Sequence, residues 1–290
     1  MTLAMTTSAC SMLPAFRSTD PGNWAVYYGK DASPEQLRRY DLLVLDSRQY
    51  PPLESLDQPR QTILGYASLG EATEQEMQAM PQLRQAVIAE NTTWKTYVMD
   101  LNAPAWQQYL LQQRLPDILD RGFDGFMLDT LDSPLHHGAQ KPELGKQDMA
   151  AVYLLDQIRT RFPDAFVMLN RGFAVYPYAA RYVDAVLAES ILVHYNLHTQ
   201  EASYFADQDY GNYLGKLRNA KGLNPKLRIY TLDYWRPGDA QGIHNIYQIQ
   251  RNNGFYPYVS TPDLNSLFPQ VTPKQSRNLN TVSHDRHALS

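Results

Sequence analysis

Short apolar runs alternate with amphipathic stretches along almost the whole chain, beginning at Trp24. Eight of these runs are nearly continuous in hydrophobicity, which is typical of parallel strands buried on both faces. They are Trp24–Tyr28, Leu42–Leu45, Ile63–Ala67, Gly125–Leu128, Phe166–Leu169, Ala185–Ala188, Arg228–Leu232 and Phe255–Val259. A further apolar patch, Tyr97–Leu101, is either a ninth strand or the lead-in to a helix.

Helical patterns lie between the runs. Ser33 is a capping residue before Pro34 at the first helical position. Other segments carry apolar residues at helical spacing, clearly in the first two and more weakly in the rest: Pro104–Leu119, Met149–Phe162, Tyr213–Ala220 and Gly242–Asn252. Eight strands alternating with helices favour one α/β domain over 23–269, a single (β/α)8 TIM barrel, with an open doubly wound sheet as the alternative.

The two ends of the chain differ from this pattern. Residues 1–22 read as a disordered or processed N-terminus, without the charged start and long apolar run of a secretory signal. Residues 270–290 are polar and without periodicity, as in a tail or linker. Cys10 is the only cysteine, so no intrachain disulfide can form. No run reaches the ~18 apolar residues that a membrane span needs.

Composition narrows the partner classes. The formal net charge is −4, and this mild acidity argues against a nucleic-acid partner, which leaves a basic patch. The chain holds 20 Tyr, 4 Trp and 9 Phe, a number that suits a carbohydrate groove but is also explained by ordinary packing.

Polar side chains follow nearly every predicted strand. In a (β/α)8 barrel the carboxyl ends of the strands gather at the mouth that carries the active site. Any single Asp, Asn or Ser there could simply cap a helix or form a turn. Several carboxylates at one mouth repel one another, however, and this arrangement is costly unless it is used.

Two carboxylates stand out as a catalytic pair. Asp129 ends an apolar strand that begins after a glycine turn, whereas Asp124 precedes that strand and reads as a structural residue at the opposite end of the barrel. Glu189 ends the run from Val183, with a salt bridge to Arg171 as the alternative to catalysis. Glycoside hydrolysis needs two carboxyl groups flanking the scissile bond, and these strand ends could supply them.

Several segments together resemble glycoside hydrolase family 114. They are Trp24–Gly29, Tyr40–Asp46, Leu64–Glu71, Gly122–Asp129 and Leu187–Ser190, within a resemblance spanning roughly Trp24 to Pro269. The family comprises endo-α-1,4-polygalactosaminidases and the related hydrolase module of the Pel exopolysaccharide proteins. The resemblance implies a barrel that cleaves α-1,4-linked galactosamine or N-acetylgalactosamine polymers internally, with Asp129 and Glu189 as the pair and no cofactor.

The expected mechanism retains the anomeric configuration, with Asp129 as nucleophile and Glu189 as general acid and base. The carboxyl groups would then lie ~5–5.5 Å apart, against ~6.5–9.5 Å in an inverting enzyme. Acidic residues at the mouth could pair with the ammonium groups of the sugar, unless they only orient the catalytic pair. The substrate-binding candidates are Tyr28, Asp46, Ser68, Glu71, Asp132, Asn170, Arg171, Tyr195, Asp233 and Tyr258.

Two other functions stay open. A metal-dependent carbohydrate deacetylase or hydrolase would have to use His136 and His137, or His194 and His198, although loop histidines are the simpler interpretation. A catalytically silent barrel that only binds polysaccharide would have no need of an acidic pair. For the hydrolase, the expected location is the periplasm or outside the cell, in biofilm exopolysaccharide metabolism, with other exopolysaccharide-biosynthesis proteins as candidate partners.

Overall fold

The computed structural model describes residues 22–56, 61–141 and 146–269. The expectations for 1–22 and 270–290 therefore lie outside the described residues, apart from residue 22. Eight strands form one sheet in the order β1-β2-β3-β7-β8-β9-β12-β13, and neighbouring strands run parallel. They are β1 (Trp24–Tyr27), β2 (Leu42–Leu45), β3 (Thr62–Ser68), β7 (Gly125–Asp129), β8 (Phe166–Asn170), β9 (Ala185–Glu189), β12 (Arg228–Tyr234) and β13 (Tyr256–Ser260).

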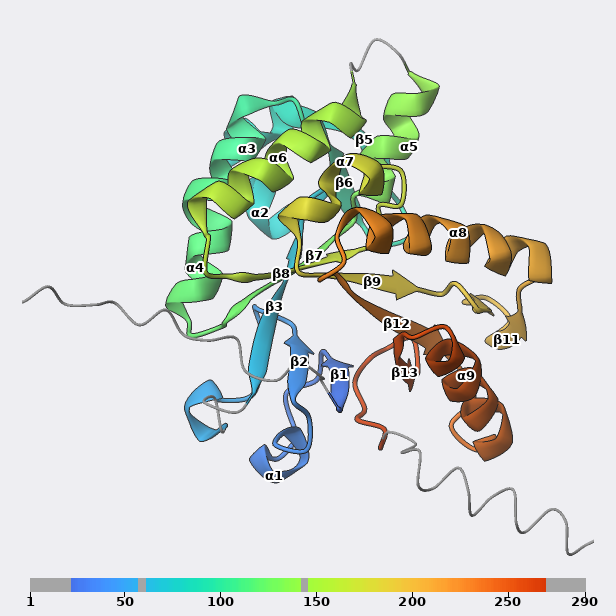
Figure 1. The fold of residues 1–290 in the computed structure, drawn as a ribbon. Coiled ribbons are helices and arrows are strands. Elements are labelled where there is room, and N and C mark those ends of the chain that lie inside the picture. Colours follow the sequence, from blue (N-terminus) through green and yellow to red (C-terminus); the bar gives the residue numbers. More distant parts are fainter. Residues whose placement is uncertain (1–21, 57–60, 142–145, 270–290) are drawn as a thin grey trace, which may run out of the picture.

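The sheet curls into a nearly closed barrel with helices around it (Figure 1). Its first and last strands meet at Trp24, whose ring N–H donates to the carbonyl of Tyr256 at 3.0 Å. The centre of the same ring lies 5.0 Å from the ring centre of Tyr230 and 5.6 Å from that of Tyr258. The predicted (β/α)8 barrel and its eight strands are thus confirmed, and the doubly wound alternative is wrong because the strands follow in sequential order.

The predicted helices are also confirmed. They are α1 (Pro34–Leu37), α6 (Gln147–Arg161), α8 (Asp207–Leu223), α9 (Ala240–Asn252) and a continuous stretch of α3 (Pro104–Tyr109), the π-helical η3 (Leu110–Arg114) and α4 (Leu115–Asp120). Pro116 lacks the N–H that Gln112 would need as a partner, which accounts for the wider turn just before it. The sequence pattern missed α2 (Glu74–Ala79), α5 (Asp132–Gln140) and α7 (Tyr176–Ala179). Shorter 3-10 turns are η1 (Leu53–Ser55), η2 (Pro81–Ala86) and η5 (Ala180–Tyr182).

Two insertions leave the barrel at its carboxyl end. Strands β4 (Glu71–Thr73), β5 (Val87–Asn91) and β6 (Thr96–Met99) form an antiparallel sheet after β3, and β10 (Val193–Asn196) pairs with β11 (Glu201–Tyr204) after β9. The apolar patch at Tyr97–Leu101 is therefore largely a strand, β6, but it lies outside the barrel. None of the helices within the described ranges is both long and apolar enough to cross a membrane.

Asp124 closes the opposite end of the barrel. Its carboxylate accepts a hydrogen bond of 2.7 Å from the backbone N–H of Ile63, joining β3 to the approach to β7. Asp124 is thus a structural residue, as its position before the strand predicts.

The first prediction concerns the packing of β7 against β8. A Cβ at Gly125 would overlap the carbonyl oxygen of Phe166, which belongs to the backbone and cannot turn away. We expect Gly125→Ala to lower the free energy of unfolding by about 1–3 kcal/mol or more. As a control, Gly211→Ala in α8 has nothing within 4 Å of the new Cβ and should raise it by roughly 0.5–1 kcal/mol. Urea denaturation compares the two, and an unchanged Gly125→Ala protein would contradict the packing argument.

Candidate active site

Three polar residues end three neighbouring barrel strands. Asp129 is the last residue of β7, Asn170 of β8 and Glu189 of β9. Asn170 is only 2% exposed, whereas both carboxylates are partly exposed. Each side chain comes at the carboxyl end of an otherwise buried apolar strand, so the barrel brings the three together as the sequence predicts.

One amide joins the two carboxylates. The Asn170 side-chain nitrogen donates to Asp129 Oδ1 at 2.9 Å and to Glu189 Oε2 at 2.7 Å. These two oxygens therefore lie no farther apart than the sum of the two bonds, 5.6 Å. This limit is below the ~6.5–9.5 Å that an inverting pair needs to admit water between the carboxyl groups.

Two tyrosines complete the set of donors. The Tyr234 hydroxyl donates to Glu189 Oε1 at 2.5 Å, and the Tyr66 hydroxyl hydrogen-bonds the Asp129 carboxylate. Burial raises the pKa of both hydroxyls well above the usual range, and the neighbouring carboxylates raise it further. Both tyrosines therefore remain protonated hydrogen-bond donors across the pH range in which proteins are stable.

The pKa of Asp129 differs from that of a free aspartate carboxyl group. Burial, followed by the nearby charge of Glu189, raises the pKa of Asp129 to about 6. Hydrogen bonds from the Thr130 backbone, Asn170 and Tyr66 oppose this rise by stabilising the ionised form. Asp129 consequently changes charge near neutral pH, where an acid, base or nucleophile is useful.

The backbone is strained directly after each of the three polar strand ends. Thr130, Arg171 and Ser190 have positive φ angles of 67°, 50° and 50°. Such angles are unfavourable for residues other than glycine, above all for a β-branched threonine. The Thr130 hydroxyl is fixed by contacts to Ser68 Oγ at 2.6 Å and from the Gly70 N–H at 2.9 Å, which hold this conformation.

Arg171 and Asp132 form an ion pair beside Asp129 and Glu189. Arg171 Nε lies 2.8 Å from Asp132 Oδ2, and Asp132 also accepts from the Gly172 N–H at 3.1 Å. Arg171 contacts Glu189 only through the backbone carbonyl, at 2.8 Å. The alternative of an Arg171–Glu189 salt bridge is therefore wrong, and the Glu189 carboxylate forms no ion pair with any of the described residues.

Glu71 is a buried anchor at the mouth. It is 5% exposed and accepts hydrogen bonds from Asn91 at 3.0 Å, from Thr96 at 2.5 Å and from the Ser133 hydroxyl. These contacts tie the β5–β6 hairpin and the start of α5 to the start of β4. Glu71 lines the cleft, but its oxygens already have protein partners.

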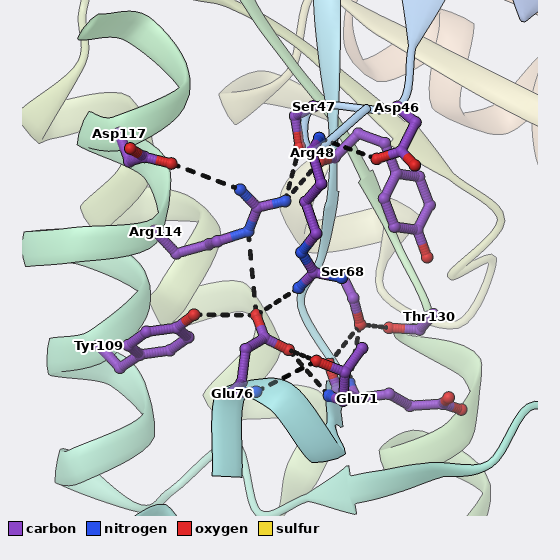
Figure 2. A network of polar contacts seen from close by, with 12 residues as sticks. Asp46, Ser47, Arg48, Ser68, Glu71, Glu76, Tyr109, Arg114, Asp117 and Thr130 are labelled. Carbon is purple, nitrogen blue, oxygen red and sulfur yellow. Dashed lines mark hydrogen bonds and ion pairs between the residues drawn. The ribbon is translucent and has the colours of Figure 1, made fainter. Parts of the chain in front are cut away.

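A second polar network contacts β3 through the backbone carbonyl of Tyr66 (Figure 2). Glu76 is 8% exposed and lies 2.7 Å from Arg48 and 2.9 Å from the Tyr109 hydroxyl. Arg114 donates to Ser47 Oγ at 2.6 Å and to the Tyr66 carbonyl at 3.1 Å. The network fixes the backbone of Tyr66 and holds the Arg48 guanidinium at the edge of the cleft.

The cleft that contains the pair has a volume of about 860 Å³. Of the substrate-binding candidates, six line it: Tyr28, Ser68, Glu71, Asp132, Asn170 and Arg171. Among the lining residues that the sequence does not predict are Arg48, Tyr66, Trp94 and Tyr234. Tyr234 could have been found, because side chains alternate along a strand and Tyr234 has the opposite orientation to Asp233.

Four candidates lie outside the lining of the cleft. Asp233 is fully buried and accepts from Val193 N–H at 3.0 Å and Gln250 at 2.8 Å, so it faces the barrel wall. Tyr258 is fully buried between aromatic rings, and its hydroxyl accepts from the Phe268 N–H at 3.1 Å. The prediction that Asp233 and Tyr258 contact the substrate is therefore wrong, because both side chains are buried.

The other two candidates, Asp46 and Tyr195, are partly exposed but lie outside the lining of the cleft. Asp46 accepts from the backbone N–H of Arg48 at 2.9 Å, in a tight turn after β2. Tyr195 belongs to β10, with its ring 6.3 Å from that of Tyr234. Neither one lines the cleft around the pair.

The histidines form no metal centre within the part of the chain that the structure describes. No three His, Cys, Asp or Glu residues there are grouped so that they could hold a metal ion. His136 and His137 are adjacent on α5 with ring centres 5.8 Å apart, while His194 lies on β10.

Comparisons with known proteins agree with this geometry. The sequence profile of glycoside-hydrolase family GH114 matches residues 6–276. The glycoside hydrolase domain of PelA from Pseudomonas aeruginosa is similar over 86% of this chain and 98% of its own, with 27% identity and a TM-score of 0.74. Aspergillus fumigatus Ega3, solved in complex with galactosamine, is similar over 88% of this chain and 98% of its own. Its identity is 12% and its TM-score 0.63, a likeness that shows the fold alone. A search of the curated proteins gives no match.

The second prediction tests the shared amide. Asn170→Ala removes a donor to the ionised form of Asp129, so the pKa of Asp129 should rise further above about 6. Carbon-detected NMR titration of the labelled aspartates measures it directly. Asn253→Ala, at the end of α9 and outside the cleft lining, is the matched control and should leave this pKa in place. An unchanged Asp129 titration in Asn170→Ala would contradict the bridging role.

Proposed function

This chain belongs to glycoside-hydrolase family GH114, and on that premise we propose that it cuts α-1,4-linked galactosamine or N-acetylgalactosamine polymers internally, with retention of configuration. The chain is a glycoside hydrolase, and the proposed substrate is a Pel-like exopolysaccharide. The substrate class rests on the resemblance of the strand segments to that family. The catalytic assignment rests on the barrel mouth itself.

The observation that carries the proposal is the double hydrogen bond from Asn170. It keeps the nearest oxygens of Asp129 and Glu189 within 5.6 Å, which fits a nucleophile and an acid acting on the same bond. A barrel that only binds polysaccharide would gain nothing from two carboxylates held together against their repulsion. We therefore favour catalysis over binding alone.

In the first step Asp129 attacks the anomeric carbon while Glu189 gives its proton to the glycosidic oxygen. The carbon–oxygen bond to the leaving sugar breaks, and an ester bond to Asp129 forms. In the second step Glu189 takes a proton from water, whose oxygen attacks the same carbon and releases Asp129. Two displacements at one carbon restore the original configuration.

The donors around each carboxylate support this assignment of the two roles. Asp129 receives hydrogen bonds from Asn170, Tyr66 and the Thr130 backbone, whereas Glu189 receives them from Asn170 and Tyr234. More donors stabilise the ionised form that a nucleophile needs. The raised pKa of Asp129 alone would suit an acid, so the pH profile and the variants below discriminate between the two assignments.

We further propose that the protein acts in the periplasm or outside the cell, where such a polysaccharide is found. Other proteins of exopolysaccharide biosynthesis are its candidate partners.

The third prediction concerns the pair itself. Asp129→Asn and Glu189→Ala should each reduce release of oligosaccharides from a galactosamine-rich exopolysaccharide by ~10³-fold or more, with unchanged thermal melting. Parent protein that releases nothing from this polymer would refute the proposed substrate. Folded variants that retain activity would refute the assigned pair.

Glu189→Ala, together with the further variant Asp129→Ala, reports the roles of the two residues. Early products of the parent should be the α-anomer by NMR. On an aryl glycoside of a galactosamine oligosaccharide, whose leaving group departs without protonation, azide should rescue Glu189→Ala and give an α-glycosyl azide, because it intercepts the ester on Asp129. Rescue of Asp129→Ala should give the β-azide, since azide then replaces the nucleophile. The reverse pattern would exchange the two roles.

The fourth prediction is the pH dependence. Because Asp129 must be ionised to attack, kcat/KM should rise with pH through a midpoint near 6, and not near the usual aspartate value. If Asp129 were the acid, kcat/KM would instead fall through the same midpoint. Burial also raises the pKa of Asp233 to about 6, so folded Asp233→Asn protein, which should keep the rising limb in place, is the control.

A further inference from the structure

The β5–β6 hairpin forms one wall of the cleft, between the end of β3 and the start of α5. Its strands are held by the buried Glu71, which accepts from Asn91 on β5 and Thr96 on β6. Asn91 also accepts from the backbone N–H of Trp94 at 3.4 Å, so the turn is tied to the same anchor. The tip of the hairpin therefore has a fixed position relative to the catalytic pair.

Trp94 lies at this tip with 65% of its surface exposed, and it lines the cleft that contains Asp129 and Glu189. The other three tryptophans, Trp24, Trp106 and Trp235, are at most 7% exposed. An indole left in water on a fixed turn contributes little to folding. Its flat apolar face matches the apolar face of a sugar ring.

A second hollow of about 440 Å³ adjoins the cleft at the hairpin. The two share Asn91, Asp132 and Ser133 as lining residues. Glu90 lines the second hollow, and none of the described residues forms an ion pair with it. The surface from the pair to the hairpin therefore combines an aromatic face with a carboxylate that has no ion-pair partner among the described residues.

We propose that the β5–β6 hairpin is a remote binding subsite for the polysaccharide, in which Trp94 stacks on a hexosamine ring and Glu90 faces an ammonium group farther along the chain. The inference rests on the proposed function, because the ligand is the same galactosamine-containing polymer. Trp94 binds the chain away from the cut bond and takes no part in the chemistry. It gives the enzyme affinity for chains long enough to reach from the pair to the hairpin.

The experiment uses the full chain with Glu189→Gln, which should bind without cutting, and galactosamine oligosaccharides of increasing length. Since Trp94 is the exposed tryptophan, binding of the longer oligosaccharides should change the intrinsic fluorescence. Adding Trp94→Ala should weaken their binding about tenfold by calorimetry, and Trp94→Phe should retain most of the affinity while losing the fluorescence change. Tyr153→Ala, which removes a 53% exposed ring on the outer helix α6, is the matched control and should bind normally.

The outcomes separate this inference from the proposed function. If the parent cuts the polymer but Trp94→Ala neither weakens binding nor raises KM, the subsite is refuted and the hydrolase stands. If long oligosaccharides bind without any fluorescence change, the subsite is likewise refuted. If the parent neither cuts nor binds galactosamine chains, the proposed substrate fails and the subsite fails with it.

Discussion

The barrel mouth depends on holding two like-charged carboxylates, Asp129 and Glu189, within 5.6 Å of each other. Burial of Asp129 and repulsion from Glu189 raise the pKa of Asp129 to about 6, which disfavours the doubly ionised state. The protein meets this cost with neutral donors: the Asn170 amide serves both carboxylates, and the Tyr234 hydroxyl serves Glu189. Among the described residues no cation pairs with either carboxylate, because Arg171 is bound to Asp132. Neutral donors stabilise the charges without fixing them, so a proton can still be exchanged with a substrate.

The positive charges near the mouth are kept apart from the pair by their own partners. Arg48 is bound to Glu76, and the buried Arg114 beside them holds Ser47 and the Tyr66 backbone. This network, shown in Figure 2, fixes β3 and so the place from which Tyr66 reaches Asp129. A buried polar network of this kind is rigid only when its members are satisfied, and the contacts of Glu76 meet that condition. Two of the strained residues after the strand ends are held by backbone hydrogen bonds to the neighbouring strand, from the Arg171 N–H to the Leu187 carbonyl at 2.9 Å and from the Ser190 N–H to the Leu232 carbonyl at 2.8 Å.

Strand ends were the most predictable part of the site. Asp129, Asn170 and Glu189 each end an apolar run, and the closure of a parallel barrel brings such ends together whatever the loops do. The prediction failed where it ignored the alternation of side chains along a strand. The carboxylate at the end of β12 predicts Asp233 at the mouth, but its neighbour Tyr234 is the residue that faces the mouth. A difference of one residue changes the face, since the period of a strand is two.

The sequence by itself determined the barrel, its eight strands and the polar residues that end them. Short buried strands and helices each have a characteristic spacing of apolar residues, and this spacing can be recognised within a local segment. Only the tertiary structure decided which polar groups meet. Three of these contacts join segments far apart in the chain. Asn170 shares one amide between two carboxylates, Arg171 pairs with Asp132 instead of Glu189, and Trp94 lines the cleft. Such contacts depend on side-chain direction and on how an inserted hairpin docks, and these are set by packing across the whole domain and not by neighbours in sequence.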